Sequence, residues 1–138
     1  MPIETFKTIE HQANTLANRI LENRSKLISI LLQIENYETA LYEIDHSIDC
    51  LLNLHKQKEY FSYKVDFISC ILPVNLPLYS LILYGVIPSF LTNKIVVRPS
   101  TLSQKFVEEI FFMLKINIII SNMSLELVQR RRFIIEFL

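Results

Sequence analysis

The chain has 138 residues, of which 51% are hydrophobic and 20% charged, and its 14 lysines and arginines equal its 14 aspartates and glutamates. This composition predicts a single domain over residues 1–138 and excludes global disorder, and the even charge gives no sign of a nucleic-acid partner. Cys50 and Cys70, the only cysteines, form neither a metal-ligand spacing nor a disulfide framework, which favours the reducing cytoplasm. Gly85 is the only glycine, so a glycine-rich phosphate loop cannot be built.

Residues 1–60 are predicted to form a helical region, because they contain no glycine and no proline after Pro2. Apolar residues recur there at steps of three and four, as is typical of amphipathic helices. They are Leu16, Ile20, Leu27, Leu31 and Ile34, followed by Ala40, Leu41, Ile44, Ile48, Leu51 and Leu52. The polar pair Glu35-Asn36 is the expected break between helices. The 3 histidines of this region have no carboxylate or cysteine partners at ligand spacing, so no metal site is expected.

Residues 61–138 are predicted to alternate strands and helices. The expected strands are 65–72, which is apolar enough to be mostly buried and ends at Pro73, then 94–98 and 116–120. The expected helices are 78–91, interrupted or ended near Pro88, one capped by Ser100 or Thr101, and one that begins within 121–124 and ends at Leu138. This alternation predicts an α/β fold, in which amphipathic helices are followed by βαβαβ units with a small parallel sheet.

A membrane span is the competing interpretation of the second region. No charged residue lies between Asp66 and Lys94, and this length is sufficient to cross a bilayer. However, Pro73 and Pro77 stand one helical turn apart inside it and would leave several backbone carbonyls unpaired in lipid. The flanks also lack the asymmetry of basic residues that would set an orientation. A cytoplasmic α/β domain is therefore the preferred prediction, and a small membrane protein is the alternative.

Two motifs in the second region resemble those of a known family. The first expected strand leads into Pro73-Val74-Asn75-Leu76-Pro77-Leu78, and the second contributes to Asn93-Lys94-Ile95-Val96-Val97-Arg98-Pro99-Ser100. They resemble the Pro-x-Asn-(Phe/Val)-Pro-Leu and Gly-Asn-x-Val-Val-x-Lys-Pro-Ser motifs of the aldehyde dehydrogenase superfamily, including its acyl-CoA reductase branch. The helices of the first region resemble that family's opening helices. The resemblance covers residues 16–121 and implies the N-terminal part of a truncated, Rossmann-type cofactor domain.

Asn75 is the candidate catalytic residue. Its side-chain amide can donate two hydrogen bonds from a turn stiffened by flanking prolines, at the carboxyl end of a strand, where ligands bind in open α/β sheets. The resemblance implies that Asn75 donates to the oxyanion that forms when a thiolate attacks an aldehyde carbonyl. The other interpretation is that Asn75 caps a turn beside Pro77.

Arg98, Ser100 and Thr101 are the candidate cofactor-binding residues. A basic residue leaving a strand can reach a phosphate or a ribose hydroxyl, and a serine cap begins a helix whose N-terminus favours anions. The resemblance implies that Arg98 replaces a lysine that contacts the adenosine ribose, and that Thr101 stands where many NAD-using members have glutamate. The implied cofactor is therefore NAD or NADP. Thr92 replaces the glycine of the motif, and loss of cofactor binding is the alternative.

The family's cysteine nucleophile, its Phe-Thr-Gly-Ser segment and its activating glutamate have no counterpart in this sequence. Cys70 does not match the nucleophile, and on a buried strand a thiol behaves as a small hydrophobe. A three-stranded sheet with unpaired edges would also expose surface that another chain can cover. The leading hypothesis is a truncated, catalytically incompetent relative that acts through a protein partner or as a homo-oligomer. The alternative is one piece of a split NAD(P)-dependent aldehyde dehydrogenase or acyl-thioester reductase.

Overall fold

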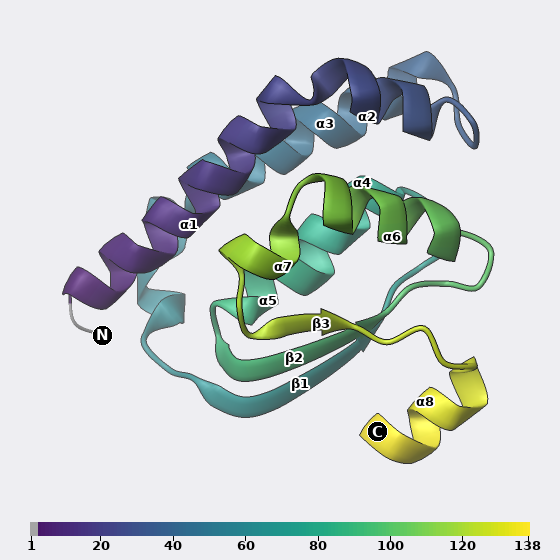
Figure 1. Ribbon diagram of the computed structural model, residues 1–138. Helices are drawn as coiled ribbons and strands as arrows, with labels where there is room; N and C mark the ends of the chain where they lie inside the picture. The colour runs from purple at the N-terminus through teal and green to yellow at the C-terminus, as the bar shows by residue number, and fades with distance from the viewer. Residues whose placement is uncertain (1–2) are drawn as a thin grey trace.

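The computed structural model describes residues 3–138, and its first layer is a set of helices (Figure 1). These are α1 (Ile3–Glu22), α2 (Arg24–Leu31), α3 (Tyr37–Leu52) and the 3₁₀ helix η1 (Leu54–Phe61). The predicted break at Glu35-Asn36 is confirmed, because Asn36 caps α3 and its Oδ1 accepts a hydrogen bond from the Thr39 N–H at 2.8 Å. At the boundary between α1 and α2, the Asn23 amide donates to the Arg19 carbonyl at 2.8 Å and competes with regular helical bonding.

The chain also forms a parallel three-stranded sheet in the order β1-β2-β3. Its strands are β1 (Val65–Ile71), β2 (Thr92–Arg98) and β3 (Met123–Leu125). The central strand is β2, in which Ile95 pairs with Ile68 of β1 and with Met123 of β3. The prediction of an α/β fold with a small parallel sheet is confirmed, and the first two strands form close to their expected positions.

One helix in three parts connects β1 to β2, and it ends beside Pro88 as predicted. The parts are α4 (Pro77–Leu81), the π-helical turn η2 (Ile82–Val86) and α5 (Ile87–Ser89). In a regular helix, Pro88 would clash with the Tyr84 carbonyl one turn earlier and could not donate to it. The wider π turn, in which the Ile87 N–H bonds to the Ile82 carbonyl, relieves this conflict.

Gly85 lies where this helix crosses the sheet closely. A Cβ atom at Gly85 would stand 2.7 Å from Cε of Met123 and 3.5 Å from Cγ2 of Val97. The missing side chain therefore lets the helix pack directly on β2 and β3, which explains why the single glycine stands inside a helix.

The segment between β2 and β3 corrects two predictions. It forms α6 (Gln104–Met113) and then α7 (Ile116–Ile119), so the prediction of a strand at 116–120 is wrong. Ile116 and Ile120 are buried while Ile118 is 69% exposed, and this spacing of four fits a helical turn better than an alternating strand. The third strand is β3, within the segment that the sequence pattern assigns to the start of the last helix. That helix, α8, begins later and spans Arg130–Phe137.

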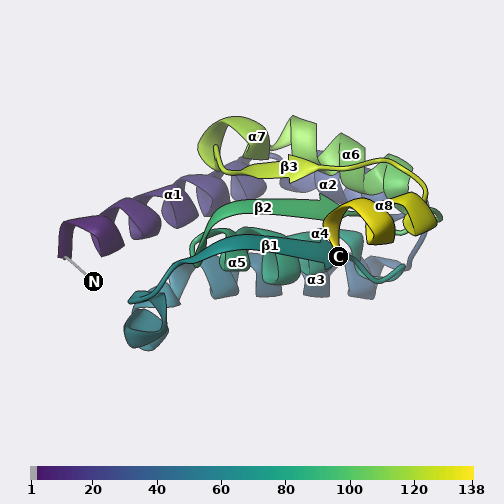
Figure 2. The ribbon, with the colours of Figure 1, turned by 90° about the horizontal axis from the view of Figure 1, so that it is seen from below.

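Helices cover the two faces of the sheet unevenly (Figure 2). One face packs against α4 to α7, whereas α8 lies on the opposite face, over the carboxyl ends of the strands. Phe133 of α8 is fully buried, and Val96 of β2 is 1% exposed. The Ser69 hydroxyl donates to the Phe137 carbonyl at 2.8 Å and fastens the last turn of α8 to β1.

The prediction that the first strand is mostly buried is wrong, because every residue of β1 is at least partly exposed. β1 forms one edge of the sheet, and Val65 and Phe67 are 51% and 43% exposed. Within residues 3–138, no helix is both long and apolar enough to cross a membrane. The uncharged segment between Asp66 and Lys94 instead forms most of β1, the three-part helix and the start of β2.

Candidate functional site

The predicted catalytic residue, Asn75, lies on an exposed turn between the carboxyl end of β1 and the start of α4. Leu76 adopts a left-handed conformation with φ of 54°, and Pro77 is the first residue of α4, where the fixed φ of proline suits a helix start. The Asn75 carbonyl accepts a hydrogen bond from the Ser80 hydroxyl at 3.2 Å. Its side-chain amide makes no hydrogen bond to any residue of the described part of the chain, so both N–H groups are available for donation.

The guanidinium of Arg98 is turned inward rather than toward solvent. Arg98 is 4% exposed, and its Nε donates to the Val128 carbonyl at 2.9 Å. Its Nη1 donates to the Pro99 carbonyl and its Nη2 to the Thr101 hydroxyl, each at 3.0 Å. Arg98 therefore joins β2 to the segment that leads into α8, a role that could not be predicted from the strand-end motif.

Neither Ser100 nor Thr101 caps the next helix, so this part of the prediction is wrong. The Ser100 carbonyl accepts from the Ser103 N–H at 3.1 Å, which forms a turn and delays α6 until Gln104. Ser103 occupies the cap position and makes no side-chain cap bond. The helix N-terminus that was expected to attract an anion beside Arg98 is consequently displaced along the chain.

The structure does not bring Asn75 and the Arg98 group together in one cavity. Arg98, Ser100 and Thr101 line a depression of about 670 Å³ at the carboxyl ends of β1 and β2, together with Cys70. Asn75 lines a separate depression of about 350 Å³, together with residues of the α2–α3 turn. A substrate held by Asn75 would thus lie beside the helical layer rather than in the Arg98 depression.

As arranged here, the Arg98 group does not fit a dinucleotide. A ribose or phosphate contact needs an accessible cation, whereas Arg98 is buried and donates to three oxygen atoms of the chain itself. Thr101 accepts one of those bonds. Binding of NAD or NADP would require these contacts to be exchanged, and the cofactor roles of Arg98, Ser100 and Thr101 stay predictions.

The two cysteines do not have the environment of a nucleophile. Burial raises the pKa of the Cys70 thiol. Burial, followed by the charge of Asp49, raises the pKa of Cys50. A thiol with a raised pKa has little thiolate at neutral pH, so neither side chain is activated for attack on a carbonyl. Within the described residues there is also no group of three metal-ligating side chains.

A buried carboxyl near the Asn75 turn, Glu43, was missed by the sequence prediction. Glu43 of α3 is fully buried, and its Oε1 accepts from the Tyr79 N–H at 2.9 Å. Burial and a hydrogen bond with Glu35 raise the pKa of Glu43 to about 9, so Glu43 is protonated at neutral pH. Glu43 and Ser47 occupy core-facing positions between Ala40 and Leu51, and this interruption of an apolar stripe was the available signal.

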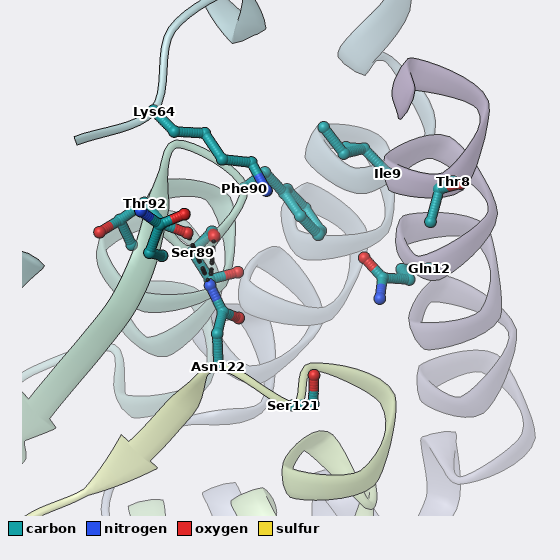
Figure 3. A pocket seen from close by; sticks show the side chains of 10 residues that line it. Thr8, Ile9, Gln12, Lys64, Ser89, Phe90, Thr92, Ser121 and Asn122 are labelled. Carbon is teal, nitrogen blue, oxygen red and sulfur yellow. Dashed lines mark hydrogen bonds between the residues drawn. The ribbon is translucent and has the colours of Figure 1, made fainter. Parts of the chain in front are cut away.

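A third depression, of about 410 Å³, lies at the opposite end of the sheet (Figure 3). Lys64 and Gln12 extend toward it, and the Asn122 amide donates to the Ser89 and Thr92 carbonyls at 2.8 and 2.9 Å. These two bonds tie Asn122, which directly precedes β3, to the end of α5 and to the start of β2. Because ligands of open α/β sheets bind at the carboxyl ends of strands, we interpret this depression as a structural junction.

No protein-family model matches the sequence, and a search of curated proteins gives no match. The structure is nevertheless similar to that of succinic semialdehyde dehydrogenase from Streptococcus pyogenes in complex with NADP+, with a TM-score of 0.78 and 12% sequence identity over 96% of this chain. This chain spans about a third of that dehydrogenase, since the match covers 33% of its length. At this identity the similarity shows the fold alone, which is the Rossmann-like fold of an aldehyde dehydrogenase segment.

Replacement of Arg98 by methionine is expected to lower the free energy of unfolding by about 1–3 kcal/mol, because three hydrogen bonds from a charged group are lost. The effect should concentrate at α8, which Arg98 connects to β2 through Val128. Urea denaturation measures the first effect, and limited proteolysis near residues 126–130 measures the second. The control is Arg131→Met, since Arg131 is exposed on α8. Equal stability of the two variants would contradict the structural role of Arg98.

Proposed function

We propose that this chain is an aldehyde dehydrogenase-like scaffold that carries no nucleophile of its own and acts by binding a protein partner. The observation that carries this proposal is the sheet: β1 and β3 are both edge strands, and α8 covers one face only over their carboxyl ends. Unpaired edge groups and exposed apolar side chains are a template for pairing with another chain. The similarity to a dehydrogenase segment supports the scaffold, and the partner is our inference.

The β1 edge is the proposed contact. Val65 and Phe67 are about half exposed on it, although large apolar side chains usually avoid solvent. In doubly wound folds, the strand that follows the first three pairs beside the first strand. We therefore propose a partner that supplies an extended apolar segment to β1. A homo-oligomer that uses the same edge would be recognised by its mass in sedimentation experiments.

Replacement of Phe67 by lysine is expected to weaken partner binding about tenfold or more, because it places a charge at the centre of the proposed apolar contact. The matched control is Tyr63→Lys, since Tyr63 is 82% exposed and lies just before β1. Tagged variants would be isolated from native cells without detergent at mild salt, and co-purifying proteins quantified by mass spectrometry. Equal recovery of every stoichiometric partner with both variants would contradict binding at β1.

A second candidate function is one piece of a split NAD(P)-dependent aldehyde dehydrogenase or acyl-thioester reductase. The observation that favours it is the available side-chain amide of Asn75 at the carboxyl end of β1. In such an assembly, a second polypeptide would supply the cysteine nucleophile and the dinucleotide contacts. The cytoplasmic location stays a prediction under either candidate.

A further inference from the structure

The Asn75 turn is fastened to the first turn of α4 rather than to the sheet. The Ser80 N–H donates to the Leu76 carbonyl at 2.8 Å, and the Ser80 hydroxyl donates to the Asn75 carbonyl at 3.2 Å. Leu76 has a φ of 54°, a region that non-glycine residues seldom occupy without support from their surroundings. The orientation of Asn75 therefore depends on what holds the start of α4.

Glu43 supplies the cap that α4 lacks locally. The first N–H groups of a helix have no partner within it, and the cap residue here, Leu76, has no side-chain acceptor. The Glu43 carboxyl, which belongs to α3, accepts from the Tyr79 N–H at 2.9 Å and also interacts with the Leu78 N–H. A buried side chain from another helix thus determines where α4 begins.

The second carboxyl beside Glu43 is that of Glu35, which lies in the turn between α2 and α3. Glu35 and Glu43 each have a buried Oε2 atom that no donor of the described residues reaches. One proton held between the two carboxyls satisfies both atoms, whereas two carboxylates would repel each other at this position. Glu35 also lines the same depression as Asn75.

We propose that Glu43 is a positioning residue for Asn75: while it shares a proton with Glu35, it holds the first turn of α4 and fixes the Asn75 amide. Loss of that proton would leave two carboxylates that repel each other. Glu35 is partly exposed, so it is the side chain with room to move away. This positioning is a property of the chain alone, while any catalytic use of Asn75 rests on the proposed split enzyme.

Other titratable groups around Glu43 do not compete for this role. α4 contains no charged side chain. On α2, Arg24 pairs with Asp45 at 3.1 Å on the surface. The Tyr79 ring contacts the rings of Tyr42 and His46 edge to face, and these side chains lie outside the Glu35–Glu43 pair. Among the described residues, Glu35 is the ionisable side chain whose hydrogen bond and charge raise the pKa of Glu43, in addition to burial, while the Tyr79 and Leu78 N–H groups lower it.

The test is a pH titration of the isolated full chain by carbon-detected NMR, which avoids the fast exchange of amide protons at alkaline pH. The reporters are the side-chain Cγ of Asn75, assigned with Asn75→Ala, and the backbone nitrogen of Tyr79. In the unmodified chain, both should shift with one common midpoint at about pH 9. In Glu43→Gln, both should stay flat, because a carboxamide keeps the shape and the acceptor but does not ionise.

Two further variants test whether the midpoint depends on the Glu35–Glu43 pair. Glu35→Gln should lower the common midpoint by about one pH unit or more, because its amide donates to the ionised form of Glu43. Glu38→Gln, at an exposed position of α3, should leave the midpoint unchanged. A Tyr79 titration without an Asn75 response, or a transition that persists in Glu43→Gln, would overturn the proposal. No partner or substrate enters the measurement, so this failure would be distinct from failure of the proposed function.

Discussion

At pH 8, Glu43→Gln is expected to be more stable than the unmodified chain by up to about 5 kcal/mol. The folded chain keeps Glu43 protonated up to about pH 9, whereas this carboxyl ionises near pH 4.5 once unfolded. Between these two values the unfolded state binds fewer protons, so stability falls as pH rises, by about 1.4 kcal/mol per pH unit for one proton. The contribution of this group is fully present below pH 4.5 and is lost as pH rises through about 9.

Urea denaturation of both proteins at a series of pH values from 5 to 9.5 would measure this difference. The free energy of unfolding should decline with pH in the unmodified chain and decline much less in Glu43→Gln. Glu38→Gln serves as the control, because it makes the same substitution at an exposed position on the same helix. Parallel pH profiles for the unmodified chain and Glu43→Gln would show that Glu43 ionises normally in the folded state.

Asn75→Ala is expected to reduce turnover by about two to three orders of magnitude in a complex with a partner that supplies a nucleophile. The amide is unpaired within the described residues and held by a supported turn, so it is free to donate to a developing oxyanion once a partner covers this exposed site. Because such a bond is made mainly in the transition state, kcat should fall while KM changes little.

Aldehyde-dependent and acyl-thioester-dependent NAD(P) reduction or oxidation by the purified complex would measure that effect. The matched control is Asn93→Ala, since Asn93 is also exposed but lies at the start of β2, away from the carboxyl ends of the strands. Unchanged turnover in Asn75→Ala would exclude the oxyanion role and leave the scaffold function as the proposal. Turnover by the chain alone would contradict its description as lacking a nucleophile.

Local patterns predicted much of this fold. Steps of three and four between apolar residues gave the helical region, and the polar pair Glu35-Asn36 marked the start of α3. Runs of β-branched residues gave β1 and β2, and Pro88 marked the end of the helix between them. The apolar run 116–120 was misassigned because short apolar runs fit a strand and a buried helical turn equally well. Only packing decides between these two, and here it buries Ile116 and Ile120.

The sequence by itself determined the α/β class, the order of the first helices and strands, and the two motifs that place Asn75 and Arg98 at strand ends. Only the tertiary structure decided the environment of those residues. It enclosed Arg98 beneath the segment before α8, separated it from Asn75, and joined Glu43 to the start of α4. The physical reason is range: helical and strand periodicity depends on neighbouring residues, whereas burial, hydrogen-bond partners and pKa depend on groups tens of residues away in the chain.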